Sequence, residues 1–565
     1  MRIFVFTFLF ALFIPRLLGQ PLSHQWVNRV GGGADNEKLW RIAVDGTGNV
    51  YATGYFRGTF TDQGISVTSI GGADIILLKY APDGTLLWAR NAGGTNDDAG
   101  FGIDCDKEGN VYVTGLFSGL AIFDTQLLSI PEPDGTPLPF HFVARYDPDG
   151  DLVWVRTVTV PMLVATYPNS IGYAVKLDRA GDLIVVGSYT NTNVDAVDPA
   201  FSTMQADTCR FLTTYSNGYT NVFAQKLDTL GNTEWVHSVG GLNGFGSLFS
   251  LTFSAQNHIW TRGDMYGAGF VSGPVNLPLG PGQGGLVYEL SSTGQPLSGF
   301  LVPATGFANV EDLIVANNGE VFLAGWYQGG ALAGGPPAQG YDGFLMRTSP
   351  SGTPVWVNRL TGPGDDFFSG IATTPSPNEI VGGAFYFYQA AFAGTNLSLA
   401  SGTNSALVRL DTMGTLLEVL QPQLLGGLSK IADVQSDDFG NFFLCGDVSG
   451  NVLFTNDTLQ CTSQDMYVTK VVRDPSAGAD ELSTSVDRWS IFPNPADTWV
   501  TLRTDGLGWR PERVIVLDLA GRVVQATPLR SDRNVLDVSA LSSGAYRLVL
   551  EGAEQRTSRT IMVQR

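Results

Sequence analysis

Seven copies of one short sequence divide most of this chain into units of similar length. The first copy, GNVYATG, ends at Gly54, and its relatives end at Gly115, Gly187, Gly263, Gly325, Ala384 and Gly446. Successive copies end 61, 72, 76, 62, 59 and 62 residues apart. This period is too long for a helical solenoid unit and fits one four-stranded sheet with long loops. The repeat therefore predicts an all-β toroid with seven blades.

Each repeat divides into four β-strand patterns separated by glycine-containing turns. In the first repeat the strands are expected at residues 39–45, 49–56, 74–80 and 85–92. Adjacent columns of the second strand are both apolar, beginning with Val50 and Tyr51. Successive strand residues point to opposite faces, so both faces of each sheet are expected to be covered. Sheets packed between sheets provide that environment.

The start of the repeat region supplies the strand that its last repeat lacks. Tryptophan follows a turn glycine by four residues at Trp88, Trp154, Trp235 and Trp356, whereas Trp26 has the same strand context with no preceding repeat. The chain thus begins with a fourth strand at 23–30, and its last repeat ends with a third strand at 465–472. Pairing them would close the ring and remove exposed sheet edges. We therefore predict a seven-bladed β-propeller over residues 23–473, closed by the N-terminal strand.

A basic residue recurs near the end of the third strand. The column contains Lys79, Arg145, Lys226, Arg347, Arg409 and Lys470, with Glu289 in the remaining repeat. One interpretation is a ring that binds a ligand. The other, which we favour, is one structural role repeated in each sheet, with long stems lying along apolar surface.

Two long insertions mark a candidate binding face. They span residues 118–139 and 189–218, between the second and third strands of the second and third repeats. Both are expected to leave the same face of the ring. Long loops on a rigid scaffold often carry binding sites, so this face is one candidate surface.

The combination of GNVYVTG, a third strand that ends in Lys-Tyr, Pro-Asp-Gly and Leu-Leu-Trp resembles the SBBP-type β-propeller repeat of bacterial secreted proteins. The resemblance extends over residues 23 to about 473 and is clearest in the first, second and seventh repeats. It implies a propeller architecture. It implies no particular chemistry, because function resides in sites rather than folds.

The N-terminus has the pattern of a secretory signal peptide. Met1 and Arg2 precede an apolar run from residue 3 to 18, with cleavage expected near Gly19 or Gln20. We assign residues 1–19 to this signal. The run is short for a membrane span, and no later window is apolar enough to cross a bilayer. The mature chain is therefore expected to be soluble outside the cytoplasm, with no transmembrane segment.

The C-terminal part is a separate module. Residues 474–486 form a polar linker, and residues 487–565 contain short alternating strands separated by Pro, Gly and Asn turns. Such a segment suits a small antiparallel, Ig-like β-sandwich. Three motifs occur in order within it: Pro493-Asn494-Pro495, then Asp518 with Gly521 and Arg522, then Leu541, Gly544 and Tyr546 in LSSGAY.

These motifs resemble the type IX secretion C-terminal sorting domain of Bacteroidota. The resemblance implies passage through the periplasm and across the outer membrane, with the type IX machinery as partner. It implies a secreted or surface-attached product, usually after removal of the domain. The alternative is an ordinary Ig-like adhesion module.

The net charge of the chain constrains its binding partners, and its cysteine content constrains its disulfides. A net charge of −20 without a basic stripe argues against nucleic acid as a partner. Four cysteines are too few for a disulfide scaffold. Cys445 is expected at the end of one strand and Cys461 just before the next, so the sequence predicts a Cys445–Cys461 disulfide.

No familiar catalytic motif is present. The sequence contains no GxSxG or HExxH, and no two of its four histidines have metal-ligand spacing. We therefore assign no catalytic, cofactor-binding or metal-binding residue and expect no cofactor.

Acidic pairs are the one constellation with candidate chemistry. Loops entering the first strand of four repeats carry Asp35 and Glu37, Asp97 and Asp98, Glu311 and Asp312, and Asp365 and Asp366. Around the mouth of a central channel, such carboxylates could bind calcium or perform acid–base chemistry on a glycoside. Alternatively, they cap strand ends and accept hydrogen bonds from turn amides, the role that we favour.

Two functional classes follow. We favour a non-enzymatic secreted or surface protein that binds an extracellular glycan or protein. The alternative is a secreted polysaccharide hydrolase or lyase that uses the channel-mouth acids.

Overall fold

The computed structural model is all-β in the residues it describes, with no helix among them. It describes residues 21–473 and 488–563 except 32–36, 131–134, 159–168, 191–204, 208, 211–219, 240, 243–245, 268, 279–283, 375–378, 398–401, 456, 493–495, 497, 507–509, 518–522, 532 and 553–555. The predicted signal peptide, residues 1–19, and the linker, 474–486, lie outside these residues. The chain divides into a large unit, Ser23–Val472, and a second unit that contains Arg473–Arg565.

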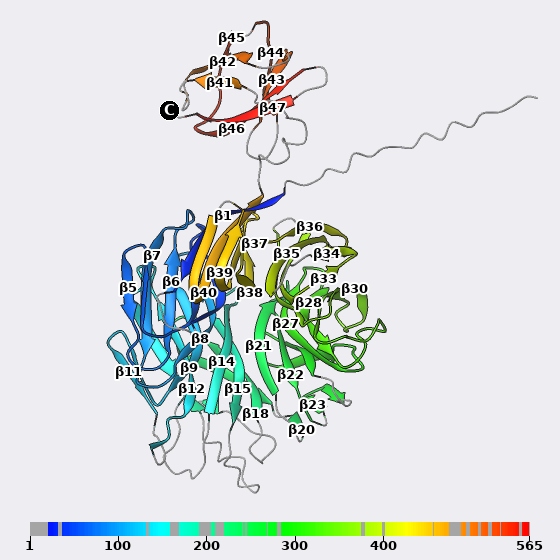
Figure 1. Cartoon of the computed structure of the whole chain (residues 1–565). Helices are drawn as coiled ribbons and strands as arrows, with labels where there is room; N and C mark the ends of the chain where they lie inside the picture. Colours follow the sequence, from blue (N-terminus) through cyan, green and yellow to red (C-terminus); the bar gives the residue numbers. More distant parts are fainter. Residues whose placement is uncertain are drawn as a thin grey trace, which may run out of the picture. The chain divides into compact units, whose positions relative to one another are not determined.

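Seven antiparallel sheets in the large unit share one plan of four hydrogen-bonded strands (Figure 1). Sheet 1 contains β2 (Lys38–Val44), β3 (Val50–Phe56), β6 (Asp74–Tyr80) and β7 (Leu86–Gly93). Sheet 2 contains β8 (Ala99–Cys105), β9 (Val111–Ser118), β12 (Pro139–Tyr146) and β13 (Leu152–Thr157). Sheet 3 contains β14 (Asn169–Leu177), β15 (Leu183–Thr190), β18 (Thr220–Leu227) and β19 (Thr233–Val239). Sheet 4 contains β21 (Gly246–Phe253), β22 (Ile259–Met265), β25 (Gly285–Leu290) and β26 (Pro296–Leu301).

The remaining sheets complete the series. Sheet 5 contains β27 (Phe307–Val315), β28 (Val321–Gln328), β29 (Asp342–Thr348) and β30 (Pro354–Thr361). Sheet 6 contains β31 (Asp366–Thr373), β32 (Glu379–Phe387), β35 (Thr403–Asp411) and β36 (Leu416–Leu420). Sheet 7 contains β38 (Leu428–Ser436), β39 (Phe442–Phe454), β40 (Asp457–Arg473) and β1 (Leu22–Val30), in the order β38-β39-β40-β1.

Short hairpins extend the connections between strands. They are formed by β4 (Thr59–Asp62) with β5 (Ile65–Thr68), β10 (Leu120–Phe123) with β11 (Gln126–Ser129), β16 (Gln205–Ala206) with β17 (Cys209–Arg210), β23 (Gly269–Ser272) with β24 (Val275–Pro278), and β33 (Ala390–Phe392) with β34 (Thr395–Leu397). Two short strands, β20 (Gly241–Leu242) and β37 (Gln423–Leu424), pair with β23 and β39.

The first strands of the seven sheets contact one another in series. β2 contacts β8, followed by β14, β21, β27, β31 and β38, and β38 in turn contacts β2. Each sheet thus packs against its neighbours, which is a β-propeller-like organisation. Because β3 is covered on both faces, nearly all its residues are buried, and it has no polar face toward solvent.

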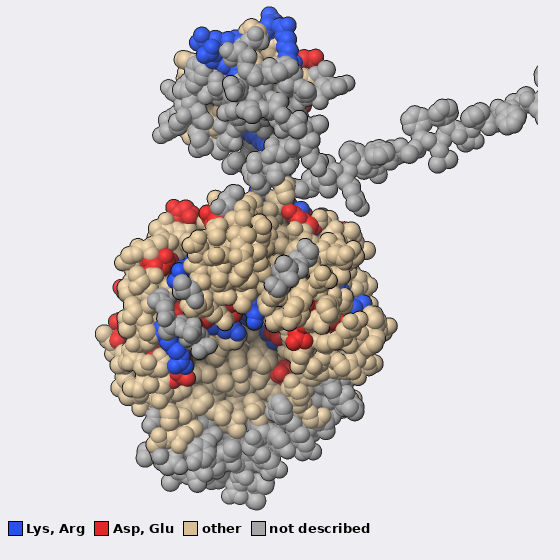
Figure 2. All heavy atoms as spheres, in the orientation of Figure 1, with Lys and Arg blue, Asp and Glu red and all other residues tan. Residues whose placement is uncertain are grey.

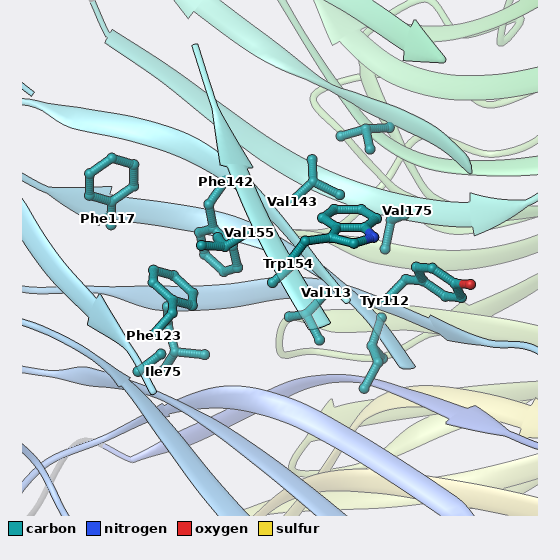
Figure 3. Packing of buried hydrophobic residues seen from close by; sticks show 14 of the residues in the cluster. Ile75, Tyr112, Val113, Phe117, Phe123, Phe142, Val143, Trp154, Val155 and Val175 are labelled. Atoms are coloured by element: carbon teal, nitrogen blue, oxygen red, sulfur yellow. The ribbon is translucent and has the colours of Figure 1, made fainter. Parts of the chain in front are cut away.

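The apolar core lies between sheets. Figure 3 shows one cluster in which Ile75 of β6, Phe142 of β12 and Val175 of β14 belong to the same group of buried side chains. These residues come from sheets 1, 2 and 3, so burial of one sheet depends on its neighbours. Each Å² of apolar surface that is removed from water stabilises the folded state by roughly 25 cal/mol. Packing between the sheets is therefore the main stabilising contribution.

The recurrent tryptophan joins four of the sheets to the next one, through Trp26, Trp88, Trp154 and Trp356. The indole N–H of Trp88 donates a hydrogen bond to the carbonyl of Pro148 (3.1 Å), and Trp154 donates to Thr229 (3.1 Å). Trp26 of β1 makes the same bond to the carbonyl of Pro82 (3.0 Å). β1 therefore uses the contact that fourth strands use elsewhere in the unit.

The basic column has a related structural role. Lys79 Nζ donates to the carbonyl of Pro148 at 2.8 Å, and Arg145 donates to that of Thr229 at 3.1 Å. Lys226 instead forms ion pairs with acids, including Asp182 at 2.9 Å. Long basic side chains here bind turns and carboxylates within the fold, as the structural interpretation predicted.

The predicted Cys445–Cys461 disulfide is wrong. Both cysteines are free, and in the β39–β40 ladder Cys445 lies opposite Val468 whereas Cys461 lies opposite Gly450. The two positions are therefore five residues apart along the ladder, about 16 Å at the usual strand rise. A disulfide requires Cα atoms within about 7 Å. The prediction failed because β40 begins at Asp457, so Cys461 lies inside the strand rather than before it.

The second unit contains two antiparallel sheets. One has the order β41 (Arg488–Phe492), β42 (Trp499–Gly506) and β45 (Arg533–Asp537). The other has the order β44 (Val523–Pro528), β43 (Arg513–Leu517), β46 (Gly544–Glu551) and β47 (Arg556–Val563). Val500 and Leu502 from the first sheet share a buried core with Val514 and Leu548 from the second.

The sorting-motif residues are described only in part. Leu541 is buried in this core, and the Tyr546 hydroxyl donates to the carbonyl of Ser542 at 3.0 Å. Gly544 begins β46. Pro493, Asn494, Pro495, Asp518, Gly521 and Arg522 lie outside the described residues. Across the part of the chain that the structure describes, no helix is long and apolar enough to span a bilayer.

Candidate ligand-binding site

A β-bulge interrupts the first strand of every sheet at an equivalent position. In sheet 1 the register shifts between Leu39 and Arg41, which leaves Trp40 unpaired. The residues at the equivalent shifts in sheets 2 to 7 are Phe101, Tyr173, Phe249, Glu311, Ser369 and Ala432. A bulge re-aims the side chain of the extra residue, so these seven residues can point away from the sheets.

The same bulge explains the glycine that ends the repeated sequence. Gly54 lies opposite Leu39, beside the bulge, and a Cβ atom on it would lie 1.8 Å from the carbonyl oxygen of Lys38. A Cβ on Gly115 would lie 1.9 Å from the carbonyl oxygen of Ala99. Such distances are impossible for real atoms, so close backbone approach requires glycine here. Six of the seven copies end in this glycine, and sheet 6 has its bulge beside Ala384 instead.

All seven bulge residues line one cavity of about 470 Å³. We call it the axial cavity, because its lining comes mainly from the first strands, β2, β8, β14, β21, β27, β31 and β38. Its volume falls within the range of about 300–1,000 Å³ typical of small-molecule sites. All seven bulge residues are partly exposed rather than buried, as expected for side chains that face a cavity.

Aromatic side chains form two arcs in the wall of the axial cavity. In the first arc, ring centroids are 5.7 Å apart for Trp40–Phe101, 5.7 Å for Phe101–Tyr173 and 4.6 Å for Tyr173–Phe249. In the second arc they are 5.9 Å apart for Trp326–Phe367 and 4.9 Å for Phe367–Phe385. Rings at these distances hold one another in place and contribute apolar surface to the cavity lining.

Positive charge gathers in the same place. Four basic residues line the axial cavity, Lys38, Arg41, Arg262 and Lys430, against two acids, Glu311 and Asp447. Figure 2 shows Lys and Arg atoms at the hollowed centre of the large unit. The cavity therefore has an excess of basic side chains in a chain whose net charge is −20.

The cations lie against the ends of the aromatic arcs. Lys38 Nζ is 3.5 Å from the ring centroid of Trp40, and the guanidinium carbon of Arg262 is 5.0 Å from that of Phe249. Lys430 Nζ is 5.4 Å from the centroid of Phe385. These cation–π contacts fix the charged groups beside the aromatic faces.

Burial shifts the ionisation of these groups. Burial lowers the pKa of Lys38, although Asp447 opposes the shift, and burial raises the pKa of Asp447. Burial also lowers the pKa of Arg262 to about 10, partly offset by Glu311. Arg262 is only 2% exposed and donates hydrogen bonds to the backbone and carboxylate of Glu311. The charged groups are thus incompletely solvated and favour a partner of opposite charge.

Several polar atoms of the cavity lining have no hydrogen-bond partner in the protein. They are Trp40 Nε1, Arg262 Nε, Asn309 Oδ1 and Asp447 Oδ1. Leaving one buried polar group unpaired costs about 1–3 kcal/mol. Two are donors and two are acceptors, and each of the four atoms is buried beneath the surface of the cavity.

A second, smaller cavity of about 240 Å³ lies further along the same first strands. Its polar groups have partners within the fold: Asp312 accepts from Ser250 Oγ at 2.7 Å, and Asp433 accepts from the amide of Ile42 at 3.0 Å. This cavity lacks the aromatic walls of the first.

The predicted channel-mouth acids lie in different environments. Asp98 is 1% exposed and accepts from the amides of Gly94 (2.7 Å) and Ser118 (2.8 Å). Asp97 accepts from the amide of Ala73 at 2.8 Å. These contacts are of the strand-capping kind.

The other acids are similarly dispersed. Asp366 is fully buried, and burial raises its pKa to about 8, whereas Asp365 accepts from the amide of Tyr341 at 3.4 Å. Glu311 lines the axial cavity, and Asp312 lines the smaller one. Among the described residues, no group of three or more His, Cys, Asp or Glu side chains could hold a metal ion. Asp35 lies outside them.

Sequence reasoning missed the aromatic residues of the cavity, although a signal was present. Trp40, Phe101, Tyr173 and Phe249 each precede the last glycine of their repeat by fourteen residues. Aligning that column would have identified an aromatic position shared by four consecutive repeats. The long-loop face predicted at 118–139 and 189–218 lies partly outside the described residues, and 191–204 and 211–219 are not among them.

Comparison with known families identifies the C-terminal module. Residues 490–564 match the secretion system C-terminal sorting domain. This domain indicates export through the type IX secretion system to a secreted or cell-surface location.

Two curated proteins are similar to parts of the chain. A regulatory protein of Caulobacter vibrioides, FlaEY, is 28% identical over 333 residues, which are 56% of this chain and 33% of that protein. An uncharacterized WD repeat-containing protein of Acanthamoeba polyphaga mimivirus is 24% identical over 262 residues, 40% of this chain and 17% of that protein. The chain thus spans a third or less of either relative.

Among solved structures, the WD40 domain of Neurospora crassa Pan2 is 10% identical, with a TM-score of 0.39 over 77% of this chain and 89% of that domain.

Proposed function

We propose that this chain is an exported, non-enzymatic binding protein whose ligand occupies the axial cavity. The observation that carries the proposal is the convergence of seven bulge residues, one from each sheet, on a cavity with aromatic walls and four basic side chains. Convergent polar groups in a largely apolar cavity are typical of ligand sites. The scaffold supplies rigid walls, and the bulges supply side chains that vary from sheet to sheet.

The scaffold we propose is a seven-bladed β-propeller over residues 23–473, of the SBBP type and closed by β1. The position of β1 beside β40 supports closure, and so does the bond from Trp26 to Pro82, which repeats the tryptophan contact of other sheets. The Thr469 hydroxyl also donates to the carbonyl of Trp26 at 2.6 Å. A closed ring would hold the seven bulges at fixed positions around one axis.

Delivery follows from the C-terminal module. We propose that residues 1–19 direct export to the periplasm and that an Ig-like sorting domain at 487–565 engages the type IX machinery, as in Bacteroidota. Removal of that domain would leave the propeller free or attached to the cell surface. A compact domain on a tether can be recognised independently of its cargo.

A polysaccharide hydrolase or lyase is the competing function. It would need a carboxyl group positioned beside substrate. Asp98 has its two oxygens bound to backbone amides, and Asp366 is fully buried, so neither side chain is exposed to a substrate. Glu311 and Asp447 do line the axial cavity, where Glu311 accepts hydrogen bonds from Arg262 and Asp447 is buried. We therefore favour binding without turnover.

The test is glycan-array binding by the full chain, with Trp40→Ala and Tyr173→Ala as cavity variants. Phe439→Ala is a suitable control, because Phe439 is 76% exposed and belongs to the same unit. We expect saccharide binding to weaken by about tenfold or more in both cavity variants and to persist in the control. Undiminished binding in both cavity variants would place the ligand elsewhere. Product release from bound polysaccharide, lost in Asp98→Asn or Asp366→Asn, would establish the enzymatic alternative.

A further inference from the structure

We infer that the ligand of the axial cavity is an acidic saccharide, held by its ring faces on the aromatic arcs and by a carboxylate between Lys38 and Lys430. This inference rests on the proposed binding function and specifies the chemistry of the ligand. Three properties of the cavity lead to it: the aromatic walls, the presence of both donors and acceptors in the lining, and the excess of basic side chains.

The aromatic arcs select a ligand with an apolar face. Trp40, Phe101, Tyr173 and Phe249 form a continuous wall in which neighbouring ring centroids are 4.6–5.7 Å apart. All four are partly exposed to the cavity. The C–H face of a sugar ring is apolar while its rim carries hydroxyl groups, so a saccharide can pack on such a wall and keep its polar groups free.

The polar side chains of the lining favour a ligand rich in hydroxyl groups. They include the donors Lys38 and Lys430 and the acceptor Glu311. A hydroxyl group is both donor and acceptor, so a polyhydroxylated ligand can bond to either kind of side chain.

The charge distribution adds the acidic group. Lys38 on β2 and Lys430 on β38 lie on the first strands of adjacent, contacting sheets, and Asp447 lies opposite Lys430 in the β38–β39 ladder. One carboxylate thus serves two ammonium groups. On the other side of the cavity, Arg262 already has Glu311 at 3.5 Å. Lys38 lies beside Trp40 and shares Asp447 with Lys430, so a ligand carboxylate there would add a charge-assisted hydrogen bond.

The inference predicts a preference that a matched pair of ligands can measure. The probes are trisaccharides of galacturonate and of glucuronate, together with their methyl esters, which keep the sugar rings and remove the charge. Calorimetry with the full chain is expected to show binding of at least one acid about tenfold tighter than that of its ester. Raising the salt concentration should weaken binding of the acid more than that of the ester.

Variants assign the preference to the two lysines. Lys38→Met and Lys430→Met should reduce binding of the acid to the level of its ester, while Lys430→Arg, which keeps the charge, should retain a preference. Lys107→Met is the control, because Lys107 is exposed on a turn of sheet 2. Unchanged thermal midpoints would show that the methionine variants are folded. If a methionine variant fails to fold, the salt dependence and the acid–ester comparison on the natural chain decide the question.

The outcomes separate the inference from the proposed function. Equal binding of acid and ester, lost in Trp40→Ala, would overturn the acidic ligand and leave the saccharide site standing. Failure of every array saccharide and every probe to bind would overturn both. Acid preference that survives in both methionine variants would overturn the assignment to Lys38 and Lys430.

Discussion

Replacing Trp26 with alanine tests whether β1 completes the ring of sheets. Trp26 is 8% exposed, its indole N–H donates to the carbonyl of Pro82 at 3.0 Å, and its ring lies against Gly84, where an added Cβ would be 2.9 Å from it. Truncating a buried tryptophan to alanine costs about 3–5 kcal/mol. We therefore expect Trp26→Ala to destabilise the entire large unit by this amount.

The expected shift in melting temperature follows from the size of the unit. Unfolding entropy is about 2.1 cal/mol/K per residue, so a unit of about 450 residues loses roughly 1 kcal/mol of stability per degree near its midpoint. Trp26→Ala should therefore lower the calorimetric midpoint by about 3–5 °C.

Two further variants make this result decisive. Trp154→Ala removes the equivalent contact inside the series of sheets, where Trp154 is 5% exposed, and should cause a shift of similar size. Trp499→Ala removes a tryptophan that is 50% exposed in the second unit and should leave the midpoint unchanged. An unchanged midpoint for Trp26→Ala together with a lowered midpoint for Trp154→Ala would refute closure by β1.

Three other outcomes are expected. Burial raises the pKa of Asp98 to about 7 and that of Asp366 to about 8, so the folded state binds more protons than the unfolded state between about pH 4 and 8. The free energy of unfolding contributed by these two groups should therefore rise as the pH falls through this range. Asp366→Asn should flatten this pH dependence in denaturant titrations. Gly115→Ala, whose Cβ would lie 1.9 Å from the carbonyl oxygen of Ala99, should destabilise the large unit or prevent its folding. Gly46→Ala, whose Cβ would have no atom nearer than 3.9 Å, should lower the free energy of unfolding by less than about 1 kcal/mol in the same titration. Equal effects of the two substitutions would refute the role of the bulge. Alkylation in denaturant without reductant should label all four cysteines, and mass spectrometry showing any protected pair would contradict the free thiols.

The all-β, propeller-like organisation could be predicted from the sequence because its physical cause is local. The GNVYATG copies mark a strand whose two faces are both apolar, and β3 is buried on both faces as expected. The sorting module was likewise predictable, since its motifs are contiguous in the chain and residues 490–564 match that domain.

The candidate site could not be predicted in the same way. The repeated glycine marks the bulge, but it does not show where the side chain of the bulged residue points, so the role of Trp40 and Phe101 depends on the assembled sheets. They face a cavity only because equivalent positions, separated by whole repeats in sequence, converge around the contacts among the first strands. For the acids the favoured interpretation was the structural one, and Asp98 does accept hydrogen bonds from the amides of Gly94 and Ser118.

A crystal structure of the protein with a bound galacturonate or glucuronate trisaccharide tests the central claim most directly. We predict electron density for the sugar in the axial cavity, with a ring packed against Trp40 or Tyr173 and a carboxylate within hydrogen-bond distance of Lys38 or Lys430. A saccharide bound on the long-loop face, with only water in the axial cavity, would contradict this account.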